Sequence, residues 1–163
     1  IKISTSGLIS ILGGKWTTYR KIGEDAVNSA ISVGGLKSSK SVSENLAIHG
    51  YNEKVNFKDP LHVYGTDLKK ILRLTNDPNG NKSLSEKLYI TKNQILWAIQ
   101  KEMALTLEDI LARRTRCLFL NVLETEKLID QVLDIMAFEL KQDGTWKKEQ
   151  KISFLSLTKK YKI

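Results

Sequence analysis

Five adjacent residues near the start of the sequence carry its clearest chemical pattern. They follow an apolar run at residues 8–12 that predicts a strand, and they are Gly13, Gly14, Lys15, Trp16 and Thr17. Two glycines allow positive φ angles and a close approach of the backbone to a ligand. Free amides at the start of a following helix, together with a lysine, suit an anion or a ring that becomes anionic on reduction. A purely structural turn is the alternative.

A second group that could bind a ligand is the arginine cluster Arg113, Arg114 and Arg116. Three guanidinium groups this close together could hold phosphates. However, Asp109 precedes Arg113 by one helical turn, which permits an ion pair within one helix. We favour this structural interpretation, with the pair partly shielded by the apolar residues around it.

The C-terminal tail combines lysines with apolar residues. Such a helix could lie on an anionic membrane, but more often it packs its apolar side on its own domain and keeps its lysines in water. The two histidines, His49 and His62, are isolated, and the single cysteine, Cys117, lies in an apolar run. We therefore predict no metal site and no internal disulfide, and we expect Cys117 to be a small buried residue.

Composition and charge indicate a globular chain. Of 163 residues, 41% are hydrophobic and 27% charged, and no apolar run approaches the ~18 residues of a membrane span. The net charge is +8, with six basic and two acidic residues in 1–40 and twenty and sixteen in the rest. Because the excess is not concentrated, we expect no nucleic-acid partner. A basic helical module that binds nucleic acid or an anionic membrane surface stays open as the alternative function.

A small, polar and charged stretch at residues 37–41 predicts a linker. It divides the chain into residues 1–40 and 41–163. The first part reads as a strand, a glycine turn and a helix that stops at Gly34 and Gly35, an arrangement typical of phosphate and cofactor binding.

The second part reads as an all-helical domain, so the expected fold class is mainly α. Helix starts are indicated by Thr91 with Gln94 in a capping box, by Thr106 and by Asn121, and a last helix is expected over 146–161. Between the linker and Thr91 the sequence predicts an extended piece at 61–64 and a short helix at 84–89.

Together these segments resemble the C-terminal end of FAD-dependent glycerol-3-phosphate dehydrogenases. "GLISILGGKWTTYRKIGEDAV" is similar to the last strand, glycine turn and helix of the family's cofactor domain. The resemblance therefore makes residues 1–40 a C-terminal remnant of an α/β FAD-binding domain. "EMALTLEDILARRTRCLFLN" is similar to the signature of its helical C-terminal domain, and "IMAFELKQDGTWKKEQ" to that domain's closing pattern. The resemblance covers nearly the whole chain and is weakest over residues 37–90.

The resemblance implies a non-catalytic C-terminal fragment, since the dinucleotide fingerprint of the family is not in this sequence. It places Gly13, Gly14, Lys15, Trp16 and Thr17 near the ring of FAD, with Lys15 also reaching the substrate and Trp16 contributing its backbone. It assigns no catalytic residue to this chain, and it makes the arginine cluster structural.

For the full-length enzyme, the resemblance implies oxidation of glycerol 3-phosphate to dihydroxyacetone phosphate, with quinone or oxygen as the electron acceptor. Bacterial members of the family suggest a cytoplasmic location, with peripheral contact to the inner membrane. A homodimer is compatible with this interpretation.

Overall fold

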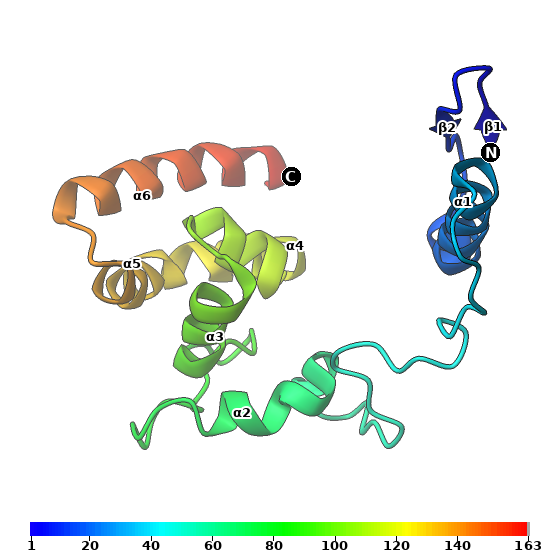
Figure 1. Cartoon of the computed structure of the whole chain (residues 1–163). Coiled ribbons are helices and arrows are strands. Elements are labelled where there is room, and N and C mark those ends of the chain that lie inside the picture. Colours follow the sequence, from blue (N-terminus) through cyan, green and yellow to red (C-terminus); the bar gives the residue numbers. More distant parts are fainter. Residues whose placement is uncertain (163) are drawn as a thin grey trace. The chain divides into compact units, whose positions relative to one another are not determined.

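The computed structural model describes residues 1–162, and it confirms a mainly α chain (Figure 1). Its contacts divide the chain into two compact units, Ile1–His49 and Gly50–Ile163. We call them the N-terminal unit and the helical unit. The division lies nine residues beyond the boundary expected at residue 40.

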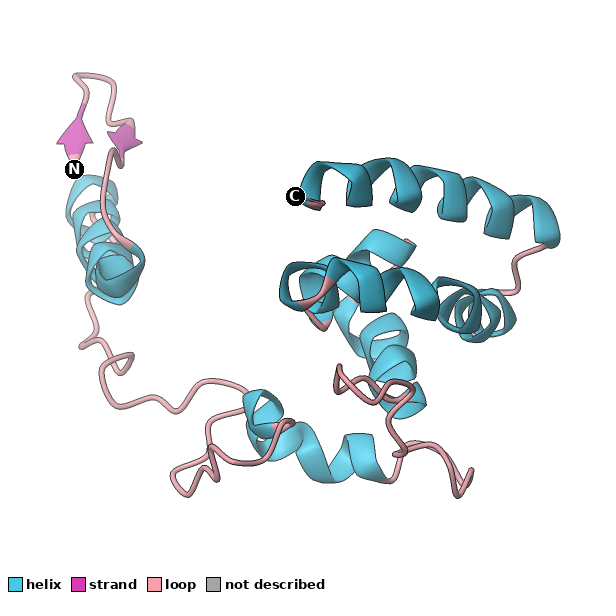
Figure 2. Ribbon diagram, turned by 180° about the vertical axis from the view of Figure 1, so that it is seen from behind, coloured by secondary structure: helices cyan, strands magenta, loops and turns pink. Residues whose placement is uncertain are grey.

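The N-terminal unit contains a small hairpin and one long helix. Strands β1 (Lys2–Ile3) and β2 (Ile9–Ser10) pair antiparallel, with Lys2 opposite Ser10 and Ile3 opposite Ile9 (Figure 2). The strand predicted over 8–12 is therefore too long, because only Ile9 and Ser10 lie in the two-stranded ladder. After a 3-10 helix, Trp16–Thr18, comes α1 (Tyr19–Gly34), which Gly35 ends in the left-handed conformation as predicted.

The first part of the helical unit is irregular. It contains a 3-10 helix, His62–Asp67, followed by α2 (Leu68–Leu72). The extended piece expected at 61–64 is wrong, because the His62 and Tyr64 amides donate to the carbonyls of Asp59 and Leu61. The helix expected at 84–89 is wrong as well. There the Leu84 amide donates to the Ile90 carbonyl and closes a loop.

Four helices form the packed part of the helical unit. They are α3 (Lys92–Glu102), α4 (Cys117–Leu120), α5 (Val122–Leu140) and α6 (Gly144–Thr158), with a π-helix, Asp109–Arg114, between α3 and α4. A 3-10 turn, Lys159–Tyr161, follows α6. Both α3 and α6 pack against α5 (Figure 1). The predicted caps are confirmed at α3 and α5. The Thr91 side chain accepts from the Gln94 amide, and the Asn121 side chain accepts from the Glu124 amide.

The last helix begins earlier than expected. Asp143 caps α6 by accepting from the Trp146 amide at 2.9 Å. The preceding helix, α5, ends at Lys141, which adopts the left-handed conformation. The core of the helical unit is apolar and continuous, and its fully buried large side chains include Ile95, Leu107, Ile110, Leu111, Leu118, Ile129, Val132, Leu133, Met136 and Phe154.

Candidate functional site

The glycine turn has a backbone that only glycine adopts easily. Gly13 has φ +76° and Gly14 has φ +111°. A Cβ on Gly14 would lie 2.6 Å from the Cδ1 atom of Ile22, whereas a Cβ on Gly13 would meet nothing within 4 Å. Gly14 thus lets the turn pack closely on α1, and Gly13 leaves its own side of the backbone open.

Thr18 fixes the step from the turn into the helix. Its hydroxyl donates to the Lys15 carbonyl at 3.0 Å and accepts from the Lys15 amide at 3.2 Å. The sequence analysis did not select Thr18. The three-residue spacing from Lys15 to Thr18 is the signal that could have found it, because helix starts use the same spacing for side-chain caps.

The predicted residues Lys15, Trp16 and Thr17 are exposed. The Trp16 side chain is 85% exposed and stacks on the ring of Tyr19, with the ring centroids 5.4 Å apart. Among the described residues, no ion pair involves Lys15. The turn therefore presents a cation that is not neutralised by a neighbouring carboxylate.

A small pocket of about 280 Å³ opens beside the turn. Its lining includes both glycines, Ile11, Leu12, Ile22 and Asp25, but not Lys15, Trp16 or Thr17. Asp25 is paired with Lys21 at 3.0 Å. The structure thus brings Gly13 and Gly14 to one pocket and leaves the other three predicted residues outside it.

The arginine cluster serves the helical unit itself. Arg113 pairs with Asp109 at 2.9 Å and with Glu108 at 2.6 Å, which confirms the predicted pair within the helix. Arg114 donates from Nη2 to the carbonyl of Glu102 at 2.5 Å and so covers the end of α3. The expected shielding is wrong for Arg113, whose side chain is 51% exposed because it lies on the outer face of the π-helix.

Hydrogen bonds set the ionisation of Asp109. Burial acts to raise the pKa of this carboxyl, but hydrogen bonds from the Thr106 hydroxyl and from two amides, together with the charge of Arg113, outweigh it and lower the pKa. Glu102 differs, because burial raises its pKa more than the charge of Arg114 lowers it. Both carboxyls belong to the packing of the π-helix against α3.

Three lysines of the tail pair with carboxylates of a neighbouring helix. Lys147, Lys151 and Lys162 pair with Asp134, Asp130 and Glu126. Because the partner numbers fall along α5 as the lysine numbers rise, the two helices run antiparallel. Ile152 is exposed on α6, whereas Phe154 is buried in the core. These pairings favour the interpretation of α6 as part of the domain rather than as a membrane-surface helix.

Few other groups could do chemistry. Cys117 is buried as predicted, and burial raises the pKa of its thiol, which makes it a poor nucleophile. Within residues 1–162, no group of three or more metal-ligating side chains lies together. Over the same residues, no helix has both the length and the apolar character that a bilayer span requires.

Comparisons with known proteins support the resemblance. Residues 9–151 match the model of the C-terminal domain of alpha-glycerophosphate oxidase. The chain is 35% identical over 167 residues to the probable mitochondrial glycerol-3-phosphate dehydrogenase of Dictyostelium discoideum, covering 92% of this chain and 26% of the relative. It is 32% identical over 172 residues to the mitochondrial glycerol-3-phosphate dehydrogenase of Homo sapiens, covering 92% and 23%. No solved structure matches the chain.

Two facts follow from these relatives. The chain spans about a quarter of their length, at the C-terminal end. The expected cytoplasmic location is contradicted, because these relatives and a third in Arabidopsis thaliana are named as mitochondrial proteins. That expectation came from bacterial members of the family, and neither charge nor composition encodes the compartment.

Proposed function

We propose that this chain is the C-terminal part of a FAD-dependent dehydrogenase. The reason is that the chain belongs to the family of the C-terminal domain of alpha-glycerophosphate oxidase. The full-length enzyme would oxidise glycerol 3-phosphate to dihydroxyacetone phosphate. The observation that carries the proposal is the match over residues 9–151, which includes both the glycine turn and the helical unit. We assign no catalytic residue to this chain.

The glycine turn fits the proposed cofactor. Gly13 leaves open space where a side chain would stand, so a flat ring could approach its backbone. The chemistry that FAD supplies when bound is acceptance of a hydride from the substrate. Lys15, Trp16 and Thr17 would lie beside the ring, with Trp16 contributing its backbone. The amides at the helix start and the Lys15 ammonium would stabilise negative charge at that end of the ring.

Lys15 would also bind the substrate. An ammonium group that no carboxylate neutralises is free to meet a phosphate, and a charge-assisted contact of this kind favours an anionic substrate over a neutral polyol. The ion pairs of the arginine cluster support a different role for Arg113 and Arg114, which would hold the helical unit together.

The partners follow from the same proposal. We propose a mitochondrial location, from the names of the relatives. The electron acceptor would be a quinone or oxygen, reached with peripheral contact to the inner membrane. A homodimer is compatible with the exposed apolar residues of both units.

The test compares the complete product of the gene with the 163-residue chain alone. We expect the complete product to be yellow and to reduce a dye when glycerol 3-phosphate is added, and the chain alone to be colourless and inactive. In the complete product, Lys15→Met should raise the KM for glycerol 3-phosphate by roughly 10- to 100-fold, as expected for a lost charged hydrogen bond of about 1.5–3 kcal/mol.

Lys148→Met is the matched control, since this lysine is exposed on α6 and should leave the KM unchanged. A complete product without flavin or without activity on glycerol 3-phosphate would overturn the proposal. An active enzyme in which Lys15→Met behaves like Lys148→Met would leave the family function standing and remove Lys15 from the site.

A further inference from the structure

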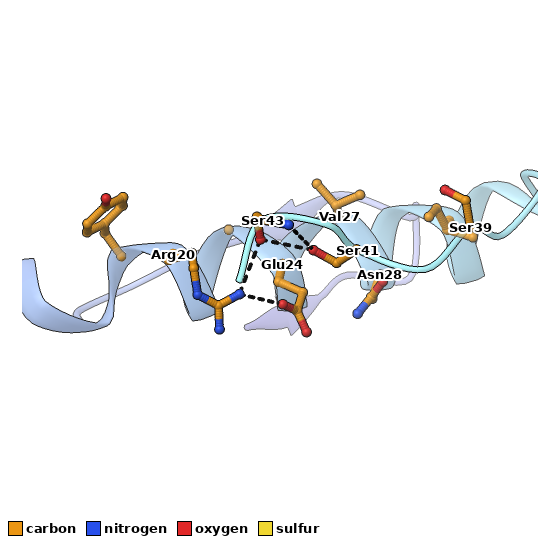
Figure 3. A pocket seen from close by; sticks show the side chains of 10 residues that line it. Arg20, Glu24, Val27, Asn28, Ser39, Ser41 and Ser43 are labelled. Carbon is orange, nitrogen blue, oxygen red and sulfur yellow. Dashed lines mark hydrogen bonds and ion pairs between the residues drawn. The ribbon is translucent and has the colours of Figure 1, made fainter. Parts of the chain in front are cut away.

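A serine-rich segment, residues 39–43, lies along one face of α1 within the N-terminal unit. Together with that helix it closes a pocket of about 420 Å³ (Figure 3). Its lining combines apolar side chains of α1, such as Val27 and Ile31, with the hydroxyl groups of the serines. The pocket is lined by Tyr19, Arg20, Gly23, Glu24, Val27, Asn28, Ile31, Ser39, Ser41 and Ser43.

Arg20 holds this segment through Ser43. Its Nη1 atom lies 3.2 Å from the Ser43 hydroxyl oxygen and 2.7 Å from a carboxylate oxygen of Glu24 (Figure 3). The Ser43 hydroxyl also lies 2.9 Å from that of Ser41. A neutral hydroxyl is a weak partner for a guanidinium group, which binds phosphate far more strongly through its forked donors.

Glu24 does not depend on Arg20 alone. Its other carboxylate oxygen accepts from Lys21 at 2.9 Å. The hydrogen bond from Lys21, followed by that from Arg20, lowers the pKa of Glu24. Arg20 can therefore change partner without leaving Glu24 unpaired, and the pocket beside Ser43 offers room for a larger anionic group.

We propose that Ser43 is a phosphorylation site and that Arg20 is the residue that binds its phosphate. A protein kinase would supply the reaction with a nucleoside triphosphate. The Ser43 oxygen would form a bond to the γ-phosphorus, and the bond from that phosphorus to the β–γ bridging oxygen would break. The nucleoside diphosphate would leave with the electron pair, and the hydroxyl proton would pass to a base of the kinase. The phosphoserine would fasten residues 39–43 to α1.

The sequence around Ser43 distinguishes it from its neighbours. It is the one serine among Ser38, Ser39, Ser41 and Ser43 with a lysine, Lys40, three residues before it. Kinases that select basic substrates read such charge patterns. Residues 36–42 contain no helix or strand, so a kinase could draw the segment out by breaking few hydrogen bonds.

The first experiment incubates the 163-residue chain with ATP and a kinase that selects a basic residue three positions before its target. Mass spectrometry should locate phosphate at Ser43, and Lys40→Ala should abolish it, while Lys37→Ala serves as the matched control. Phosphate on the other serines with none on Ser43 would overturn the assignment of the site.

The second experiment tests Arg20 on a chain that carries phosphoserine at position 43 by genetic encoding. Phosphorus NMR should show that the second pKa of this phosphate is about half a unit lower with Arg20 than with Arg20→Gln. Arg20→Lys should restore part of the difference, and all three residues are good helix formers, so α1 should persist. A phosphoserine at position 38 should titrate identically in all three chains. Equal titration of phosphoserine 43 with and without Arg20 would overturn the proposal.

Discussion

The two units of this chain use the same helix-forming rules but differ in what stabilises them. The structure describes every residue of the N-terminal unit, and none of them is buried. The helical unit contains a continuous core in which many large side chains have almost no exposure. An isolated helix as short as α1 is only marginally stable in water. The difference in stability between the two units therefore comes from packing and not from helix propensity.

The hydrogen bonds show the same difference. In α1 the ion pairs are local, from Arg20 to Glu24 and from Lys21 to Asp25. The helical unit has local pairs as well, such as Arg113 with Asp109, but it also has contacts that join separate helices, such as that of Lys151 with Asp130. The comparison indicates that the glycine turn lies in the less stable unit, where exposed residues remain available to other surfaces.

The largest expected effect is on hydrogen exchange. Amides in α1 should exchange roughly a thousandfold faster than those in the middle of α5, because opening α1 exposes no buried side chain, whereas opening α5 requires unfolding of the core. Exchange of the 163-residue chain, followed by mass spectrometry, measures the ratio. Equal protection in the two helices would contradict the comparison.

The core should account for the stability of the helical unit. Phe154 is 2% exposed, and Phe154→Ala should destabilise the unit by about 3–5 kcal/mol. Phe138 is 86% exposed, so Phe138→Ala is the matched control and should cost under about 0.5 kcal/mol. Urea denaturation followed by circular dichroism gives both values, and similar losses for the two variants would disprove the assignment of the core.

A buried polar network should have the next largest effect. A Cβ on Gly80 would lie 2.6 Å from the Thr75 hydroxyl and 2.7 Å from the Asn93 side-chain oxygen, two atoms that hydrogen-bond to each other at 2.8 Å. Gly80→Ala should therefore cost about 1–3 kcal/mol. Gly144→Ala is the control, because a Cβ there would meet nothing within 4 Å. Thermal melts that rank the two variants equally would exclude this role for the network.

Local features of this fold could be predicted, and long-range ones could not. The caps at Thr91 and Asn121 follow from side chains that meet an amide three residues on. The reverse contact of a capping box, in which a side chain accepts from the amide three residues before it, would have identified Thr18 in the candidate site. The loop around Leu84 carries helix-like spacing, but its pairing with Ile90 depends on the tertiary fold. The partners of the tail lysines likewise depend on how α6 packs on α5.

Acid should affect the helical unit through two carboxyls with opposite shifts. The lowered pKa of Asp109 gives stability that is complete above about pH 4 and is lost as the pH falls through the folded-state value. The raised pKa of Glu102 has the reverse sign and adds stability as the pH falls. Asp109→Asn should flatten the fall in Tm between pH 7 and pH 3, and Glu102→Gln should steepen it. A shift in the same direction for both variants would refute this account.

The smallest effect is expected at the exposed part of the arginine cluster. Arg113 has two acidic partners, but with its side chain 51% exposed the pairs are screened by water and should contribute under about 1 kcal/mol. Arg114 is less exposed and donates to the Glu102 carbonyl at the end of α3, so its loss leaves a helix carbonyl without that donor. Arg113→Ala should therefore lower the Tm less than Arg114→Ala. If Arg113→Ala leaves the Tm unchanged but raises the KM of the complete enzyme for glycerol 3-phosphate, Arg113 belongs to a binding site and not to the scaffold.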